Sequence, residues 1–318
     1  MKKQFLLTPP YTTIYAGDVM TQTPLVVAKW KAYQSLEGML DFLTKFSNEK
    51  NLTDPYLYLA LPHFLLYNAP KMPTGTAQGA DDMGSLAEES FTHKVAAKVL
   101  KEANVNFVLL GSSDKRHVFG ESNASIKEKV GASLAAGFQT VLCIGETADE
   151  YKEGKTQEVL TSQLTECLSD VAENKFASVI IAYEVPWSIM TGPQLDLPTY
   201  QKMVKLCREL IASNFKGKGS SQMRLLIGLP LNIEEAFPWG DENGASGFYF
   251  SEASIHPEFF QRSLQTLQGA SKVQATPEEA PPKPARKATK AKVAVEEVAP
   301  AEAPPEKKKR APRKKKIE

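Results

Sequence analysis

The fold is decided by a stretch that reads Val108-Leu109-Leu110-Gly111-Ser112-Ser113-Asp114-Lys115-Arg116-His117-Val118-Phe119-Gly120-Glu121-Ser122. It begins as a short apolar run, continues as a polar turn with several charged side chains, and leads into a segment with helical periodicity. A buried strand followed at once by a helix is typical of a parallel sheet. The stretch therefore predicts that strands and helices alternate on both sides of it.

The same alternation continues in both directions along the chain. Short runs rich in Val, Ile, Leu and Tyr predict strands, and longer amphipathic stretches predict the helices between them. Eight strands, each followed by a helix, predict an α/β fold of the (β/α)8 barrel type, and a doubly wound sheet is the less favoured alternative. The expected strands are 25–29, 56–61, 75–78, 107–111, 140–144, 178–184, 224–228 and 247–250, and the clearest helices are 35–46, 89–102, 124–136, 156–173, 198–212 and 257–267.

The opening stretch resembles the fourth-strand signature of the triosephosphate isomerase family. That signature usually reads glycine, histidine, serine, glutamate, arginine, arginine and, after a variable residue or two, Phe-Gly-Glu. The resemblance covers about 245 of the 318 residues and implies the barrel fold of this family. It implies an isomerase of triose phosphates, without cofactor or metal, but the family's catalytic histidine falls at Ser112.

Two positions match the family's other catalytic residues. Lys31 corresponds to the lysine whose ammonium attracts the substrate phosphate and the developing enediolate charge. Glu184 corresponds to the base that moves a proton between two neighbouring carbons. A carboxylate can act in this way if a closing lid excludes water and raises its pKa toward neutrality. The resemblance therefore implies that Lys31 and Glu184 are catalytic residues.

The position of the family's histidine carries a serine, which cannot exchange protons readily near pH 7. Loss of a positioned acid–base group costs roughly 10²–10⁴ in rate. His63 is a possible replacement for the histidine as the acid, but the requirement that an acid reach the substrate disfavours it. His117 is interpreted as a structural residue. Ser113 and Asp114 keep the residue types that the family has beside its site, Asp114 standing for a glutamate. We expect Ser112, Ser113 and Asp114 to lie in the substrate site.

The family's phosphate-binding loops are altered. Met190 replaces a small glycine of the lid, and the segment after Gly228 lacks the usual tyrosine and serine. After Ser251, Glu252 replaces the second glycine of the last loop. A carboxylate about 4 Å from a phosphate charge would cost ~4 kcal/mol at an effective dielectric constant near 20. Micromolar binding amounts to only ~8 kcal/mol, so we expect weak binding of triose phosphate.

Charge is distributed unevenly along the chain. Residues 271–318 contain 14 basic and 7 acidic side chains, eight prolines and no aromatic residue, whereas the rest contains 24 basic and 30 acidic side chains. This composition predicts a disordered basic tail that attracts nucleic acid or another polyanion, or a solvated tail without a partner. The predicted organisation is an extension at 1–23, a barrel at 24–270 and the tail at 271–318. Three widely spaced cysteines and the absence of a long apolar run favour a soluble cytoplasmic protein.

Dimerisation by the family's mode is in doubt. Family members insert the loop after the third strand into the partner, where a threonine meets the asparagine of the first strand. Here Ala87 replaces the threonine and Lys29 replaces the asparagine. We therefore expect a weaker dimer or a monomer.

Three functions are consistent with these observations. The favoured one is a triosephosphate isomerase-like barrel whose activity is lost or strongly reduced and which acts as a binding or interaction protein. The alternative is an active, divergent isomerase of dihydroxyacetone phosphate and glyceraldehyde 3-phosphate. A third is an isomerase for a substrate without phosphate, with Glu184 as its base.

Overall fold

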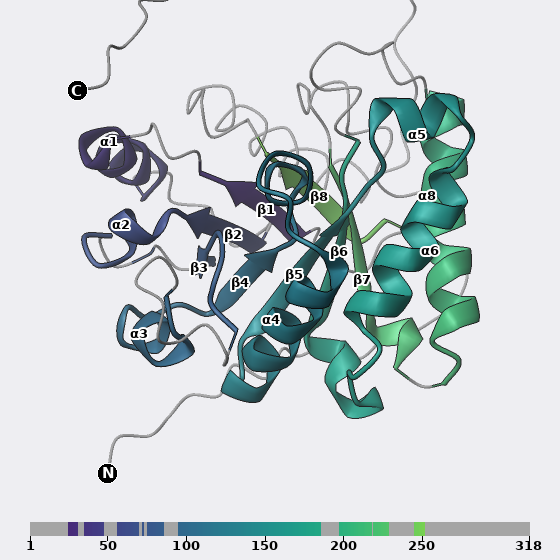
Figure 1. Ribbon diagram of the computed structural model, residues 1–318. Coiled ribbons are helices and arrows are strands. Elements are labelled where there is room, and N and C mark those ends of the chain that lie inside the picture. The colour runs from purple at the N-terminus through teal and green to yellow at the C-terminus, as the bar shows by residue number, and fades with distance from the viewer. Residues whose placement is uncertain are drawn as a thin grey trace, which may run out of the picture. The chain divides into compact units, whose positions relative to one another are not determined.

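Eight parallel strands close into a barrel in the order β1 to β8, and β8 pairs with β1 (Figure 1). The computed structural model describes residues 25–30, 35–47, 56–69, 72, 75–85, 95–185, 197–217, 219–228 and 245–251. The (β/α)8 prediction is confirmed. The strands are β1 (Leu25–Lys29), β2 (Tyr56–Leu61), β3 (Thr76–Ala80), β4 (Phe107–Leu110), β5 (Gln139–Ile144), β6 (Val179–Tyr183), β7 (Arg224–Gly228) and β8 (Gly247–Phe250).

Helices lie on the outer face of the strands (Figure 1). No helix in the part of the chain that the structure describes has the length and hydropathy of a membrane span. The helices are α1 (Leu36–Ser47), α2 (His63–Leu66), α3 (Ala97–Glu102), α4 (Asn123–Ala136), α5 (Ala148–Lys152), α6 (Thr156–Cys167) and α8 (Leu197–Asn214), with short turns η2 (Asp114–Val118), η3 (Glu173–Ser178) and η4 (Ser220–Gln222).

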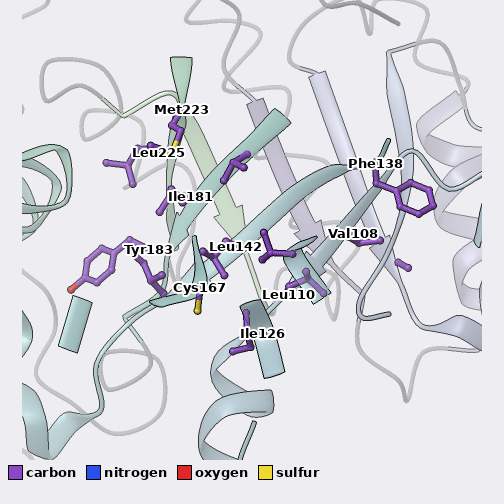
Figure 2. Packing of buried hydrophobic residues seen from close by; sticks show 14 of the residues in the cluster. Val108, Leu110, Ile126, Phe138, Leu142, Cys167, Ile181, Tyr183, Met223 and Leu225 are labelled. Atoms are coloured by element: carbon purple, nitrogen blue, oxygen red, sulfur yellow. The ribbon is translucent and has the colours of Figure 1, made fainter. Parts of the chain in front are cut away.

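The pleat of each strand divides its apolar side chains between two cores. In β5, Val141 and Cys143 face the barrel interior, whereas Leu142 and Ile144 face the helices. The outer core packs strand residues such as Leu142 against helix residues such as Ile126 (Figure 2). Because both faces of the strands are covered, the strands read as continuous apolar runs in the sequence.

Two predicted helices are shorter than expected, because local hydrogen bonds compete with the helix. The described part of the predicted helix 89–102 begins at Ala97, since Ala96 is extended and the carbonyl of Val95 accepts a bond from Gly84. The predicted helix 156–173 ends at Cys167. Just beyond it, the Ser169 hydroxyl donates to a backbone carbonyl, which favours a turn.

The predicted organisation of the chain into extension, barrel and tail stays a prediction. The segments 1–23 and 271–318 and the expected helix 257–267 lie outside the described residues.

Candidate active site

The ends of β1, β4 and β6 bring together three side chains that are far apart in the sequence. Lys29 is the last residue of β1, Ser112 follows β4, and Glu184 follows β6. All three are buried, with 4%, 1% and 3% of their surface exposed. In a parallel barrel the carboxyl ends of the strands meet at one face, where catalytic residues of this fold lie. This cluster is therefore the candidate active site.

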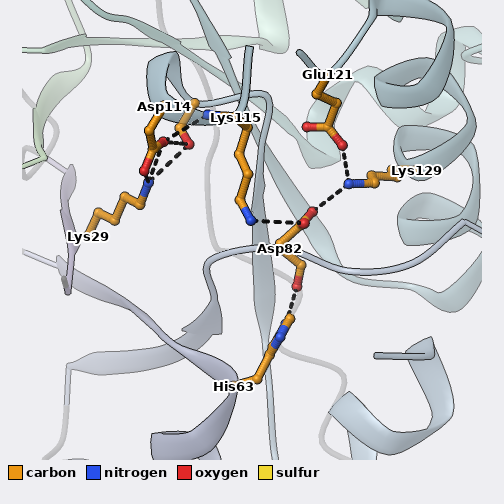
Figure 3. A network of polar contacts seen from close by, with 8 residues as sticks. Lys29, His63, Asp82, Asp114, Lys115, Glu121 and Lys129 are labelled. Carbon is orange, nitrogen blue, oxygen red and sulfur yellow. Dashed lines mark hydrogen bonds and ion pairs between the residues drawn. The ribbon is translucent and has the colours of Figure 1, made fainter. Parts of the chain in front are cut away.

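Lys29 is bound to both polar residues that follow β4. Its Nζ donates to Asp114 Oδ1 and Oδ2 at 2.8 and 2.7 Å and to Ser112 Oγ at 3.0 Å. The pair Lys29 and Asp114 appears at one end of the network in Figure 3. Burial by itself lowers the pKa of Lys29, but the carboxylates of Asp114, Glu184 and Asp81 outweigh it and raise that pKa overall. Lys29 is thus a fixed positive charge at the centre of the site.

The hydroxyl of Ser112 makes two hydrogen bonds, one as acceptor and one as donor. Its oxygen accepts the bond from Lys29, and its single proton is donated to Asp114 Oδ1 at 2.5 Å. A serine hydroxyl has one proton to donate. In this arrangement Ser112 has no further proton for a substrate oxygen.

The surroundings of Glu184 change the pKa of its carboxyl group. Its Oε2 accepts a hydrogen bond of 2.6 Å from the backbone N–H of Ser113. Burial raises the pKa of the Glu184 carboxyl, and the Lys29 ammonium and the Ser113 N–H offset only part of this rise. A carboxyl with a raised pKa in a buried site is suited to proton transfer near neutral pH.

Glycines on the neighbouring strands make room for Glu184. A β-carbon at Gly228, the last residue of β7, would lie 3.1 Å from the Cα of Glu184 and 2.8 Å from the carbonyl oxygen of Tyr183. A side chain at Gly145, after β5, would overlap the carbonyl oxygen of Glu184. The closeness of the backbones at these two points requires residues without a side chain. Gly228, which the sequence predicts to lie in the phosphate site, thus lies directly against the backbone of Glu184.

Two further groups in the barrel interior face Glu184. The thiol of Cys143 is fully buried, and burial together with the Glu184 carboxylate raises its pKa. Burial and the same carboxylate raise the pKa of Tyr249, on β8. The Tyr249 hydroxyl has no hydrogen bond of normal geometry among the described residues.

A second charged network lies beside the site, at the end of β3. Asp82 pairs with Lys115 at 3.3 Å and with the buried Lys129 of α4 at 2.8 Å (Figure 3). A ring nitrogen of His63 lies 2.7 Å from the backbone carbonyl oxygen of Asp82. His63 is therefore engaged with the backbone after β3. No interaction that the structure describes joins His63 to Ser112 or Glu184.

The structure places only some of the predicted site residues. It brings Ser112, Ser113, Asp114 and Glu184 together, and it places Gly228 beside Glu184. Ser251, directly after β8, is mostly buried at the same end of the barrel. Outside the described residues lie Lys31, Met190, Glu252 and Ala87.

Sequence reasoning missed two residues of this site. The family resemblance places Lys29 at a subunit contact, whereas its ammonium lies against Ser112 and Asp114. Tyr249 was assigned no role, although it faces the predicted base. The alternation of inward and outward side chains along β1 and β8 is a signal that could have found both. No group of His, Cys, Asp and Glu side chains within the described ranges could hold a metal ion.

Comparisons with known proteins agree with the motifs. A family model described as triosephosphate isomerase matches residues 24–267. The triosephosphate isomerase of Protochlamydia amoebophila is 30% identical over 238 residues, covering 74% of this chain and 90% of that protein. The enzyme of Chlamydia felis is 33% identical over 247 residues, covering 76% and 96%. That of Taenia solium is 29% identical over 245 residues, covering 76% and 97%.

Proposed function

Since the chain belongs to the triosephosphate isomerase family, we propose that its barrel keeps the base of an isomerase site but that its isomerase activity is strongly reduced or lost. The observation that carries the proposal is the 2.5 Å contact between Ser112 Oγ and Asp114 Oδ1, in which the hydroxyl donates to the carboxylate. The barrel then serves as a binding or interaction protein.

The proposed base is well supported by its surroundings. Interconversion of dihydroxyacetone phosphate and glyceraldehyde 3-phosphate needs a base that takes a proton from one carbon and returns it to the neighbouring carbon. Glu184 is buried at the end of β6, and its pKa is raised mainly by desolvation. The neighbouring Lys29 ammonium favours negative charge that develops on a bound substrate. These features support a site that can still form an enediolate.

The missing step is proton exchange between the two substrate oxygens. After the base has removed the carbon proton, one oxygen must receive a proton and the other must lose one. Ser112 stands where the family has its histidine, and its hydroxyl is bonded to Lys29 and Asp114. The Lys29 ammonium has a raised pKa, so it holds its protons tightly. A rate loss of roughly 10²–10⁴ is therefore expected.

An isomerase assay with the full chain tests this proposal. The wild-type protein should turn over glyceraldehyde 3-phosphate far below the common enzyme range of ~1–10³ s⁻¹. Any residual rate should disappear in Glu184→Gln, and Ser112→His should raise it at least about tenfold. Wild-type turnover within the common range, dependent on Glu184, would overturn the proposal.

The same assay distinguishes the alternative, an active and divergent isomerase. The structural observation that favours it is the buried Glu184 beside the buried ammonium of Lys29. In addition, the similar proteins are named triosephosphate isomerase. Fast turnover dependent on Glu184 would establish it. Turnover of an unphosphorylated hydroxy ketone in preference to the triose phosphate would instead support a changed substrate.

The basic tail supports a second proposal, attraction to a polyanion such as nucleic acid. Residues 307–310 and 313–316 form two basic clusters in a segment without aromatic residues. Such a segment neutralises phosphates without stacking on bases. The proposal includes a cytoplasmic location, which the three unpaired cysteines support.

A further inference from the structure

Tyr249 is a buried polar side chain to which the proposed mechanism gives no role. It lies on β8, faces the barrel interior and is fully buried. Its hydroxyl has no hydrogen bond of normal geometry among the described residues. A buried hydroxyl without a partner is unfavourable, because it has lost its hydrogen bonds to water. A buried hydroxyl is therefore expected to have an acceptor nearby.

The backbone of β7 leaves the space between Tyr249 and Glu184 open. Gly228 pairs in register with Tyr249. A β-carbon at Gly228 would lie 3.5 Å from Cδ1 of Tyr249 and 3.1 Å from the Cα of Glu184. Because Gly228 has no side chain, the ring of Tyr249 on β8 and the backbone of Glu184 after β6 both lie close to it, with no side chain of β7 between them.

The carboxylate of Glu184 has acceptor capacity left for such a contact. Oε2 of Glu184 is bonded to the N–H of Ser113, on the β4 side of the site. Oε1 does not accept this bond, and because each carboxylate oxygen can accept two hydrogen bonds it has the larger remaining capacity for a donor. The Tyr249 hydroxyl is close enough to Glu184 for each group to change the proton affinity of the other.

We propose that Tyr249 is a positioning residue, whose hydroxyl donates a hydrogen bond to Oε1 of Glu184 and fixes the orientation of the base. The two donors, Ser113 and Tyr249, then hold the carboxylate from opposite sides. This inference rests on the proposed role of Glu184 as the base.

The other charged and titratable groups around Glu184 determine how the contact would be detected. Lys29 of β1 lowers the pKa of Glu184, and Asp114 after β4 raises it. Cys143 of β5 has a thiol whose pKa is raised by burial, so it is neutral near pH 7. Burial and Glu184 raise the pKa of Tyr249, so the phenol keeps the proton that it donates. A donor to the carboxylate form stabilises the charged state.

The test is an infrared titration of Glu184 in Tyr249→Phe. The carbonyl band of the protonated Glu184 is isolated by subtracting the spectrum of Glu184→Gln, and its intensity is followed with pH in the full chain. Tyr249→Phe keeps the ring and should raise the proton affinity of Glu184 roughly tenfold.

Tyr58→Phe is the matched control. Tyr58 is another tyrosine packed in the barrel interior, but its hydroxyl is bonded to Gln139. Its removal should leave the Glu184 titration unchanged. An unchanged titration in Tyr249→Phe, or an equal shift in both variants, would overturn the inference.

This readout separates the inference from the proposed function, because it needs no turnover. If the wild-type protein proves active, the acid limb of its kcat/KM profile should move to higher pH in Tyr249→Phe, with KM nearly unchanged. A rise in KM without a shift of that limb would contradict a role in positioning the base. If the protein is inactive, the infrared titration decides alone.

Discussion

At the scale of single residues, Glu184 shows how burial and hydrogen bonding oppose each other in one side chain. Desolvation disfavours its charged form, whereas Lys29 and the Ser113 N–H favour it. The net pKa is raised, so the folded protein holds this proton more tightly than the unfolded chain does. Stability is then expected to fall as the pH rises from below the unfolded pKa to above the folded pKa.

Replacing this carboxyl by an amide should therefore stabilise the fold in a pH-dependent way. Glu184→Gln keeps the size of the side chain and removes the ionisation. Its melting temperature should exceed that of the wild type at pH 7, by about 2–4 °C for each kcal/mol gained in the free energy of unfolding. The difference should shrink near pH 4, where the wild-type carboxyl is protonated. Differential scanning calorimetry at both pH values measures it.

The control for this experiment is Glu209→Gln. Glu209 is an exposed carboxylate of α8 that lies 3.9 Å from Lys205. Exposed pairs contribute little, so its melting temperature should change by less than a few degrees at either pH. A Glu184→Gln protein that is less stable than the wild type at pH 7 would contradict the expected sign.

At the scale of elements, a buried ion pair joins α4 to the end of β3. Lys129 of α4 is fully buried and bonds Asp82 and Glu121 (Figure 3). Burial alone lowers the pKa of Lys129, but these two carboxylates raise it well above its ordinary value. Oε2 of Glu121 is buried with no hydrogen bond among the described residues, so this carboxylate depends on Lys129. The pair therefore links α4 to the end of β3.

Lys129→Met should therefore destabilise the barrel strongly. Removing the ammonium leaves the Glu121 carboxylate without its cation and leaves Asp82 paired with Lys115 at 3.3 Å. Breaking a buried pair costs about 3–5 kcal/mol. Lys127→Met is the control on the same helix, because Lys127 forms a more exposed pair with Asp170 at 2.9 Å. That pair should contribute less than about 1 kcal/mol. Urea unfolding of both variants makes the comparison, and equal losses would refute the proposed role of Lys129.

At the scale of the whole molecule, charge is separated between an acidic body and a basic end of the chain. Residues 271–318 hold 14 of the 38 basic side chains. The expectation of a weak dimer also belongs to this scale, and it stays a prediction. Ala87 lies outside the described residues, and Lys29 is bonded within its own chain to Asp114.

The basic end should give the full chain a salt-dependent affinity for duplex DNA. Replacing the four residues 307–310 by Gln should weaken binding and reduce the slope of log affinity against log salt by up to about 3–4. The control replaces four exposed barrel residues by Gln, namely Lys152, Lys202, Lys205 and Lys216. Fluorescence anisotropy over a salt series measures both. Equal losses of affinity in the two variants would refute binding through the tail.

The architecture of this protein, and the position of the residue proposed as its base, could be predicted from the amino-acid sequence alone. The bounds of β1, β2, β7 and β8 agree with those predicted, because strands buried on both faces have a local apolar signature. The motif after β4 indicated the family, and Glu184 was placed at the end of β6. Helix ends were less predictable, because side-chain and tertiary hydrogen bonds near Ala97 and Cys167 set them.

Only the tertiary structure decided which side chains share the site. Lys29 and Asp114 are 85 positions apart, and no local pattern indicates that they form an ion pair. The proposed contact of Tyr249 with Glu184 depends on Gly228, which has no side chain to occupy the space beside both residues. The contacts of a serine or a lysine at a strand end depend on barrel closure, which brings strands that are distant in the sequence side by side. Barrel closure brings the Ser112 hydroxyl into the site where it donates to Asp114. The proposed loss of activity rests on that contact.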